Sequence, residues 1–332
     1  MSLKSLPKVE LHLHHEAAAP PAFIRGLAQE KNIDISGILD DAGNYIFRDF
    51  EHFLTVYDTA CLPLQTPEDF KRLTLAALEE TAAHGVIYCE TFVSPDFCGG
   101  ADLTAWREFL AAMEEASHQA ERDFGIVHRT IVTCLRHLGP EKAKPAALCA
   151  AETAGDYLVG FGMAGAEMMG RPGDFAYSFD LAREAGLHLT CHAGEWGGPS
   201  MVAETLRDLR VERVGHGIGA IQDPEVVRQL VDQDVVLEVC PVSNVVLKAV
   251  PSWEAHPIQK LREAGVKVTV STDDPPFFHT TMTNEYAQLE KRFGWGLDDF
   301  REITDVALDA AFCDDTTRQS LISRVEAEWP ST

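Results

Sequence analysis

Histidine and acidic side chains gather at the ends of apolar segments, in patterns that suit metal-dependent chemistry. The first segment reads VELHLHH, in which His12 and His14 are two residues apart. Both side chains therefore point to the same side of an extended strand. Buried imidazoles without partners are costly to desolvate, and a divalent metal removes that cost. Alone the pair is a weak signal, because hydrogen-bonded core histidines are common.

Two later segments supply further ligands of the kind that zinc prefers. HLTCHAGE contains His192 and VTVSTDDP contains Asp273, each near the end of a predicted strand. Three imidazoles and one carboxylate, completed by an exchangeable water, form a suitable zinc set. Binuclear barrels are the alternative, and they usually bridge their metals with a lysine at the end of strand four. The fourth predicted strand, LVGFGMAG, has no lysine, so we expect one Zn2+ per chain.

Apolar strand-like segments alternate with helical segments along the whole chain. Segments such as VVLEV and VKVTVS are continuously apolar, as strands of a buried parallel sheet are. Eight strand–helix units predict an α/β fold, the (β/α)8 TIM barrel, whose active sites lie at the carboxyl ends of the strands. The predicted strands are Val9–His15, Gly85–Pro95, Ile126–His137, Leu158–Gly165, His188–Glu195, Arg213–Gly219, Val235–Asn244 and Lys267–Pro275.

The first strand and the second are separated by more chain than a simple crossover needs. We expect a single domain over residues 1–332 with a helical insertion at about 16–84. This insertion either covers a substrate at the barrel mouth or is plain scaffold. The segment Leu297–Glu328 is predicted to form packing helices. The helices predicted in the insertion are Phe23–Lys31, Phe50–Asp58 and Pro67–His84.

Charge and composition limit the partners. The chain carries 28 lysine and arginine residues against 52 aspartate and glutamate residues, a formal net charge of −24. Such a surface repels nucleic-acid phosphates and anionic membranes, so neither is an expected partner, whereas a small neutral substrate fits. The N-terminus lacks an apolar signal core and no CxxC pair occurs, so we expect a cytoplasmic protein with reduced cysteines. Nothing in the pattern indicates an oligomeric state.

Five motifs, PKVELHLH, HAGE, VGHG, CPVSN and STDDP, occur in one order along the chain. In this order and at this spacing they resemble the motifs of the adenosine deaminase family, and the resemblance covers nearly the whole chain. It implies zinc-dependent hydrolytic deamination of a 6-aminopurine. The zinc ligands that it implies are His12, His14, His192 and Asp273.

The resemblance also implies roles around the substrate. Zinc lowers the pKa of its bound water, which attacks C6 of the purine. Glu195 protonates ring N1, and His216 orients the attacking water and takes or shares its proton. Asp274 contacts N7 and the water. Adjacent side chains of an extended chain point opposite ways, so Asp274 can take this role while Asp273 binds the metal. The backbone N–H of Gly165 meets N3. His14 is expected to contact the substrate as well as the metal.

The sequence departs from the family where the first strand ends. The family usually continues with an apolar residue, an acidic residue and glycine, and this chain has His15, Glu16 and Ala17. We expect His15 to face away from the metal, because it alternates with His14. By its position, Glu16 is expected at the pocket mouth, where it would hydrogen-bond a sugar hydroxyl. Glu167 matches an acidic family position, and no role is assigned to it.

The expected reaction converts adenosine or deoxyadenosine to inosine or deoxyinosine and ammonia. TDDP rather than SDDP leans slightly towards adenosine over adenine. The alternatives are adenine itself or another 6-aminopurine nucleoside, such as aminodeoxyfutalosine. A catalytically inactive zinc-binding or signalling protein is disfavoured because Glu195, His216 and Asp274 are all present. A hydrolase of amides or esters is disfavoured by HAGE and GHG, and the zinc motif of nucleic-acid deaminases is absent.

Overall fold

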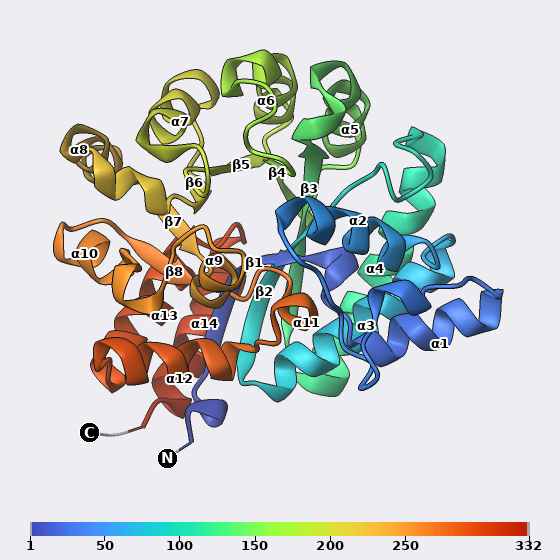
Figure 1. The fold of residues 1–332 in the computed structure, drawn as a ribbon, viewed down its shortest axis with the longest axis horizontal. Helices are drawn as coiled ribbons and strands as arrows, with labels where there is room; N and C mark the ends of the chain where they lie inside the picture. The colour runs from blue at the N-terminus through green and yellow to red at the C-terminus, as the bar shows by residue number, and fades with distance from the viewer. Residues whose placement is uncertain (1, 331–332) are drawn as a thin grey trace.

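The computed structural model describes residues 2–330, in which eight parallel strands form one sheet in sequence order (Figure 1). A bridge between Leu13 and Asp273 joins the first strand to the chain that follows the last one. The predicted TIM barrel is thereby confirmed. The strands are β1 (Lys8–His14), β2 (Val86–Val93), β3 (Val127–Leu135), β4 (Leu158–Ala164), β5 (His188–Ala193), β6 (Arg213–His216), β7 (Val236–Val239) and β8 (Val268–Val270).

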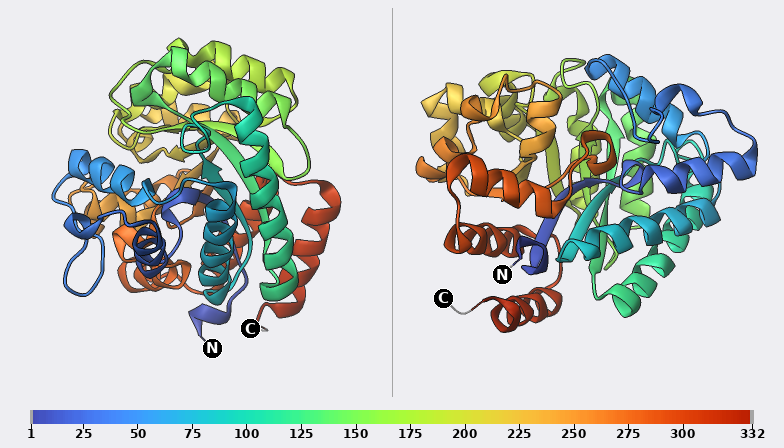
Figure 2. Two further views of the ribbon diagram at one scale, coloured as in Figure 1. Left: turned by 90° about the vertical axis from the view of Figure 1, so that its right-hand side faces the viewer. Right: turned by 60° about the horizontal axis from the view of Figure 1, so that its bottom comes forward.

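Helices surround the sheet on its outer side (Figures 1 and 2). Their ends follow local signals: Asp102 caps the start of α4, and Gly125 ends it in a left-handed conformation. The predicted packing segment at the C-terminal end consists of two helices, α13 and α14. The helices after β2 are α4 (Leu103–Phe124), α5 (Pro140–Glu152), α6 (Ala176–Glu184), α7 (Gly198–Glu204), α8 (Pro224–Asp232), α9 (Pro241–Val246), α10 (Ile258–Glu263), α11 (Pro275–Phe278), α12 (Met282–Phe293), α13 (Leu297–Ala310) and α14 (Asp315–Glu328).

Three helices lie between β1 and β2, and the segment holding the first two projects from one side of the barrel (Figure 2). They are α1 (Pro21–Lys31), α2 (Phe50–Cys61) and α3 (Pro67–Ala83), close to the predicted bounds. Helix α2 lies across the barrel mouth, where Phe53 packs against Phe277 and Phe278 of α11 with ring centroids 5.5 and 5.4 Å apart. This aromatic contact fixes α2 over the ends of the strands.

Several strands end earlier than the sequence predicts. β7 ends at Val239 because Pro241 begins helix α9, and β5 ends at Ala193 because Gly194 turns the chain with φ 74°. The polar motifs therefore lie in the loops that follow the strands. All eight cysteines lie within the described residues, and none forms a disulfide. Within residues 2–330, no helix combines the length and apolar character that crossing a bilayer requires.

Candidate active site

Four candidate metal ligands meet at the mouth of the barrel. His12 and His14 come from β1, His192 comes from β5, and Asp273 follows β8. Their ligand atoms all lie within 4.8 Å of one another. The Nε2 atoms of His14 and His192 are 3.2 Å apart. Oδ1 of Asp273 lies 3.3 Å from Nε2 of His12 and 3.2 Å from Nε2 of His14.

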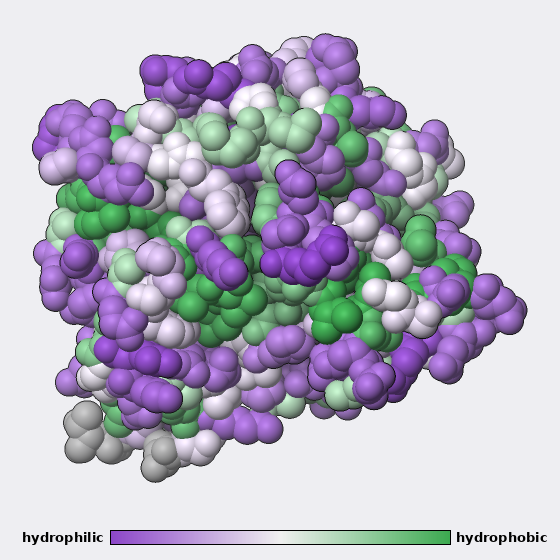
Figure 3. Space-filling view, in the orientation of Figure 1, coloured by the Kyte–Doolittle hydropathy of each residue, from purple (hydrophilic) through white to green (hydrophobic). Residues whose placement is uncertain are grey.

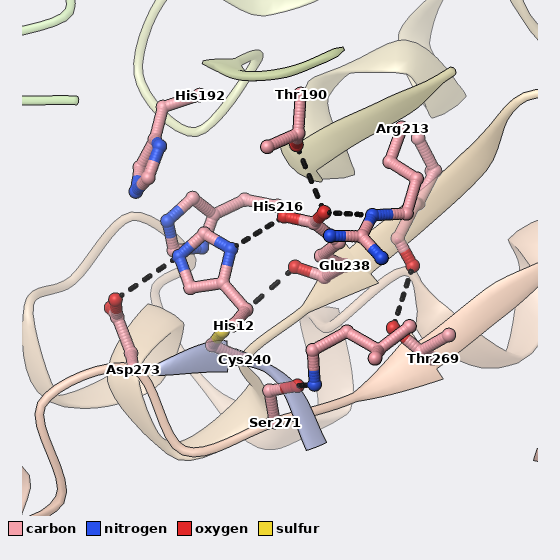
Figure 4. A network of polar contacts seen from close by, with 12 residues as sticks. His12, Thr190, His192, Arg213, His216, Glu238, Cys240, Thr269, Ser271 and Asp273 are labelled. Atoms are coloured by element: carbon pink, nitrogen blue, oxygen red, sulfur yellow. Dashed lines mark hydrogen bonds and ion pairs between the residues drawn. The ribbon is translucent and has the colours of Figure 1, made fainter. Parts of the chain in front are cut away.

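The donor set fits a divalent metal ion. Nε2 of His12 is buried and makes no hydrogen bond of good geometry within the described part of the chain. The opposite ring nitrogens are held in place. Nδ1 of His12 lies 2.8 Å from Oε2 of Glu238 (Figure 4), and Nδ1 of His192 lies 3.0 Å from the carbonyl oxygen of Met163. Such contacts orient the other nitrogen of each ring towards a metal. The four residues thus form a metal site.

Asp273 adopts a backbone conformation with φ 68°, which turns its carboxylate towards the histidines. Its backbone N–H donates to the carbonyl of His12, and the hydroxyl of Ser243 donates to Oδ2 at 2.6 Å. Burial would raise the pKa of Asp273, but its contacts with His12 and His14 outweigh burial and hold the pKa well below its usual range. The carboxylate is therefore ionised, as a metal ligand must be.

Glu195 and His216 face the same space as the metal ligands. Oε2 of Glu195 lies 3.8 Å from Nε2 of His216, and Oε1 of Glu195 is buried without a partner in residues 2–330. Burial raises the pKa of Glu195 well above its usual range. His216 ends β6 between two glycines, and a Cβ atom at Gly215 would lie 2.9 Å from the ring of His12. Gly215 therefore cannot be replaced without moving a metal ligand.

Asp274 and Gly165 line the same cavity. Oδ1 of Asp274 is buried and unpaired among the described residues, and burial, followed by the charge of Asp273, raises the pKa of Asp274 to about 8. The sequence predicts that the two neighbouring aspartates point opposite ways. That prediction is wrong, because Asp273 is left-handed rather than extended and both carboxylates line one cavity. Gly165, with φ 92°, leaves room for the ring of His137.

The residues after β1 point in two directions. His15 faces away from the metal, as predicted: its ring nitrogens contact the hydroxyls of Thr91 at 3.0 Å and Thr74 at 2.9 Å. Glu16 is 4% exposed rather than at an open mouth, and burial raises its pKa to about 7. Each residue is fixed by contacts to other parts of the chain.

Both carboxylate oxygens of Glu16 already have protein donors. The backbone N–H of Ser94 donates to Oε1 at 2.8 Å, and the hydroxyl of Tyr57 donates to Oε2 at 3.3 Å. Glu16 thus lines the cavity, but its carboxylate is held by protein donors rather than free at an open mouth. Neither Ser94 nor Tyr57 is near Glu16 in the sequence, so the sequence motif did not indicate this arrangement.

The cavity beside the metal ligands holds about 710 Å3 of empty space, including the part open to solvent. Figure 3 shows a hollow near the centre of this face, with hydrophobic surface beside it. Helix α2 forms an apolar roof over a floor of histidine and carboxylate side chains. The roof residues from α2 are Phe50, Phe53, Leu54, Tyr57 and Asp58, and the polar floor includes His14, Glu16, His137, His192, Glu195, His216, Asp273 and Asp274.

Comparison with known proteins gives the family. A family model described as adenosine deaminase matches residues 7–328. The chain belongs to the adenosine deaminase family. An adenine deaminase of Chelativorans sp. (strain BNC1) is 45% identical over 321 residues, which cover 97% of this chain and 98% of that protein. An adenine deaminase of Agrobacterium fabrum is 43% identical over 320 residues, covering 96% and 98%.

Solved structures of family relatives have the same fold. The adenine deaminase from Arthrobacter aurescens aligns with a TM-score of 0.89 and 32% identity, covering 97% of this chain and 99% of that one. An amidohydrolase from Burkhoderia ambifaria, solved with bound Zn, aligns with a TM-score of 0.85 and 25% identity, covering 98% and 91%. This member of the adenosine deaminase family is thus a deaminase, a hydrolase of carbon–nitrogen bonds whose substrate is a small purine.

The same relatives correct the expected substrate. Adenosine or deoxyadenosine is the wrong expectation, because relatives at 43–45% identity over almost their full length are adenine deaminases. The free-base alternative is better supported. The resemblance recognised the family, but the family contains both kinds of substrate and its shared motifs surround the reacting end of the purine.

Three residues to which the sequence analysis gave no role hold the histidines of the site or the partners of those histidines. The side-chain nitrogen Nδ2 of Asn244, in CPVSN, lies 3.1 Å from Nδ1 of His216. This contact orients the ring so that its Nε2 faces the cavity. Glu238, in VVLEV, contacts His12. Arg213 forms an ion pair of 2.6 Å with Glu238 (Figure 4) and another of 2.6 Å with Glu90. Charged residues inside apolar strands were the signal that could have identified Arg213 and Glu238.

We expect Glu238→Gln to weaken zinc binding by about 10- to 100-fold, because carboxylates behind a metal-binding histidine typically contribute that much. The substitution removes the charge that holds Nδ1–H of His12 while keeping the side-chain shape. Competition with a chromogenic chelator measures the affinity. Glu212→Gln is the matched control, because it removes a carboxylate from His188, outside the site. Equal zinc affinity in both variants would exclude this role for Glu238.

Proposed function

We propose that the protein is a zinc-dependent adenine deaminase that converts adenine and water to hypoxanthine and ammonia. The assignment of the free base is supported by the adenine deaminases that resemble the chain over 96–97% of its length. It is carried by one observation in the cavity: the acidic residue at the position that would hold a sugar, Glu16, is bound by Ser94 and Tyr57.

Tyr57 closes the sugar side of the cavity. Its hydroxyl donates to Glu16, and its ring packs against Phe97 and Phe277 with centroids 6.2 and 5.8 Å away. A sugar attached to N9 that reached Glu16 would need the space beside this carboxylate that the Tyr57 side chain occupies. Free adenine carries only hydrogen at N9 and does not need that space. The closed side therefore favours the free base.

The metal set is proposed to hold one zinc ion. Zinc would be held by His12, His14, His192 and Asp273, and when bound it lowers the pKa of a coordinated water towards ~7 and so supplies a nucleophile at neutral pH. A second group, in which His216 and Cys240 join Asp273, shares a carboxylate with the first. Strand β4 has no lysine that could bridge a second ion, which supports a single ion.

The remaining residues act on the purine and on the water. Glu195 donates a proton to N1, which makes C6 electrophilic, and His216 orients the attacking water through Nε2 and shares its proton. Water oxygen bonds to C6 as N1 gains its proton. The amino group then takes the proton that His216 received from the water, the C6–amino bond breaks and ammonia leaves. The proton of the new C6 hydroxyl returns to Glu195 as the C6 carbonyl of hypoxanthine forms. Asp274 contacts N7, and the backbone N–H of Gly165 contacts N3.

Opening the sugar side should shift specificity. We expect Tyr57→Ala to lower the ratio of kcat/KM for adenine to kcat/KM for adenosine by about 10-fold or more, a typical size for removing one steric or polar determinant. Ammonia release from each substrate gives the ratio. Phe50→Ala is the control, because it also truncates the roof of α2 but Phe50 does not contact Glu16. The closed-side account fails if Tyr57→Ala leaves the ratio unchanged.

A further inference from the structure

Glu167 is a buried carboxylate that the reaction described above does not use. It lies in the loop after β4 and is 2% exposed. Its side chain accepts hydrogen bonds from three backbone N–H groups of one turn. Oε1 accepts from Gly194, and Oε2 accepts from Trp196 at 2.6 Å and from Gly197 at 3.1 Å. Charge-assisted bonds of this kind are stronger than neutral ones, so the turn is held firmly.

The turn held by Glu167 carries Glu195. Strand β5 ends just before it, and the carbonyl of Gly194 accepts a hydrogen bond from the N–H of Gly219 at 2.7 Å. The backbone N–H groups on either side of Glu195 point at Glu167, while the side chain of Glu195 lines the substrate cavity. The position of the Glu195 carboxyl therefore depends on a backbone that Glu167 fixes from behind.

Glu167 is itself anchored at the backbone. Arg136, which is 2% exposed, donates to the carbonyl of Glu167 at 2.8 Å and to the carbonyl of His192 at 3.0 Å. One guanidinium thus joins the loop after β4 to the end of β5. The two carbonyls come from the chain segments that hold Glu195 and the metal ligand His192. The whole unit is fixed relative to the metal site.

Close packing shows how little room the turn has. A Cβ atom added at Gly197 would lie 2.8 Å from Oε1 of Glu167, closer than real Cβ contacts allow. The ring of Trp196 lies 5.2 Å from the ring of Phe50 in α2, so the same turn also contacts the roof of the cavity. A shift of this turn would therefore move both the carboxyl and the roof.

We propose that Glu167 is a positioning residue that holds the carboxyl of Glu195 within hydrogen-bonding reach of purine N1. The proposal rests on the proposed function, in which Glu195 donates the proton. Without the carboxylate, three buried N–H groups lose their acceptor and the turn relaxes. A displacement of about 1 Å at a reacting group can cost about 10²-fold in rate.

The test is Glu167→Gln, which keeps the shape but presents an amide NH2 to the backbone N–H groups. We expect kcat for adenine to fall by about 10²-fold, with KM changed much less and zinc content unchanged. Gly197→Ala should lower kcat in the same way, because the added methyl group would push the turn away from an intact Glu167. This second variant tests the proposal if Glu167→Gln does not fold. Asp69→Asn is the matched control, because Asp69 also accepts two backbone N–H groups but caps α3. Full kcat in both test variants would overturn the proposal.

A double-mutant cycle separates positioning from a general role in stability. In the Glu195→Gln background, Glu167→Gln should cost almost nothing further in kcat, because the group that it positions is already lost. Hydrogen exchange at the amides of Gly194, Trp196 and Gly197 should become faster in Glu167→Gln, with Cys191 in β5 unchanged. Additive losses, or unchanged exchange, would overturn the positioning role. Full activity of Glu195→Gln alone would instead overturn its assignment as the proton donor.

Discussion

Glu195→Gln is expected to fold, to keep its zinc and to lose about 10²- to 10⁴-fold in kcat, the usual cost of removing a general acid or base. The carboxyl lies in the turn after β5, where burial raises its pKa and Oε1 has no other partner in the described chain. It can therefore carry a proton at neutral pH and give it to the substrate. Glutamine has the same shape and cannot protonate N1.

The comparison for this variant is Glu204→Gln, which removes a carboxylate from α7 nine residues later in the chain. Glu204 pairs with Arg171 and does not line the cavity. We expect Glu204→Gln to keep normal turnover, because Glu204 and its largely exposed partner Arg171 lie outside the cavity. Steady-state ammonia release and zinc content should be measured for both variants. Near-normal turnover of Glu195→Gln would remove Glu195 from the mechanism.

His12→Ala is expected to lose both the metal and activity. His12 contributes Nε2 to the site at the barrel mouth, and Glu238 holds its other nitrogen. The loss of a Lewis acid removes several kcal/mol of transition-state stabilisation, which corresponds to a rate lower by about 10³-fold or more. Elemental analysis of the purified wild type should give close to one zinc per chain, and His12→Ala should give almost none.

His15→Gln provides the matched control for the metal site. His15 is three residues from His12 in the chain, but its ring contacts Thr74 and Thr91 rather than the metal ligands. We expect this variant to keep its zinc. Two tightly bound metal ions per wild-type chain would contradict the mononuclear site. Equal loss of zinc from His12→Ala and His15→Gln would contradict the division of roles along this segment.

The parts of the fold that the sequence predicted depend on periodic patterns. Alternation along a strand put His12 and His14 on one side and His15 on the other, and buried apolar segments indicated parallel strands. The predicted positions of His192 and Asp273 near strand ends followed from the barrel. These features depend on neighbours in the chain, so local spacing is enough to predict them.

The features that the sequence did not predict depend on contacts between distant residues. Ser94 is 78 positions from Glu16 and Tyr57 is 41 positions from it, and no local pattern indicates that either donates to its carboxylate. The left-handed backbone at Asp273 has no glycine to signal it, which is why the two aspartates were expected to point apart. Glu167 matched a family position, but its three backbone partners became evident only from the fold.

The most direct test of the proposed function compares kcat/KM for adenine with kcat/KM for adenosine in the zinc-loaded wild-type protein. The rate of ammonia release gives both values. The closed sugar side predicts that adenine is preferred by about 10²-fold or more, because the sugar of the nucleoside needs space that the Tyr57 side chain occupies beside Glu16. A preference for adenosine, or equal use of both substrates, would contradict the assignment of the free base.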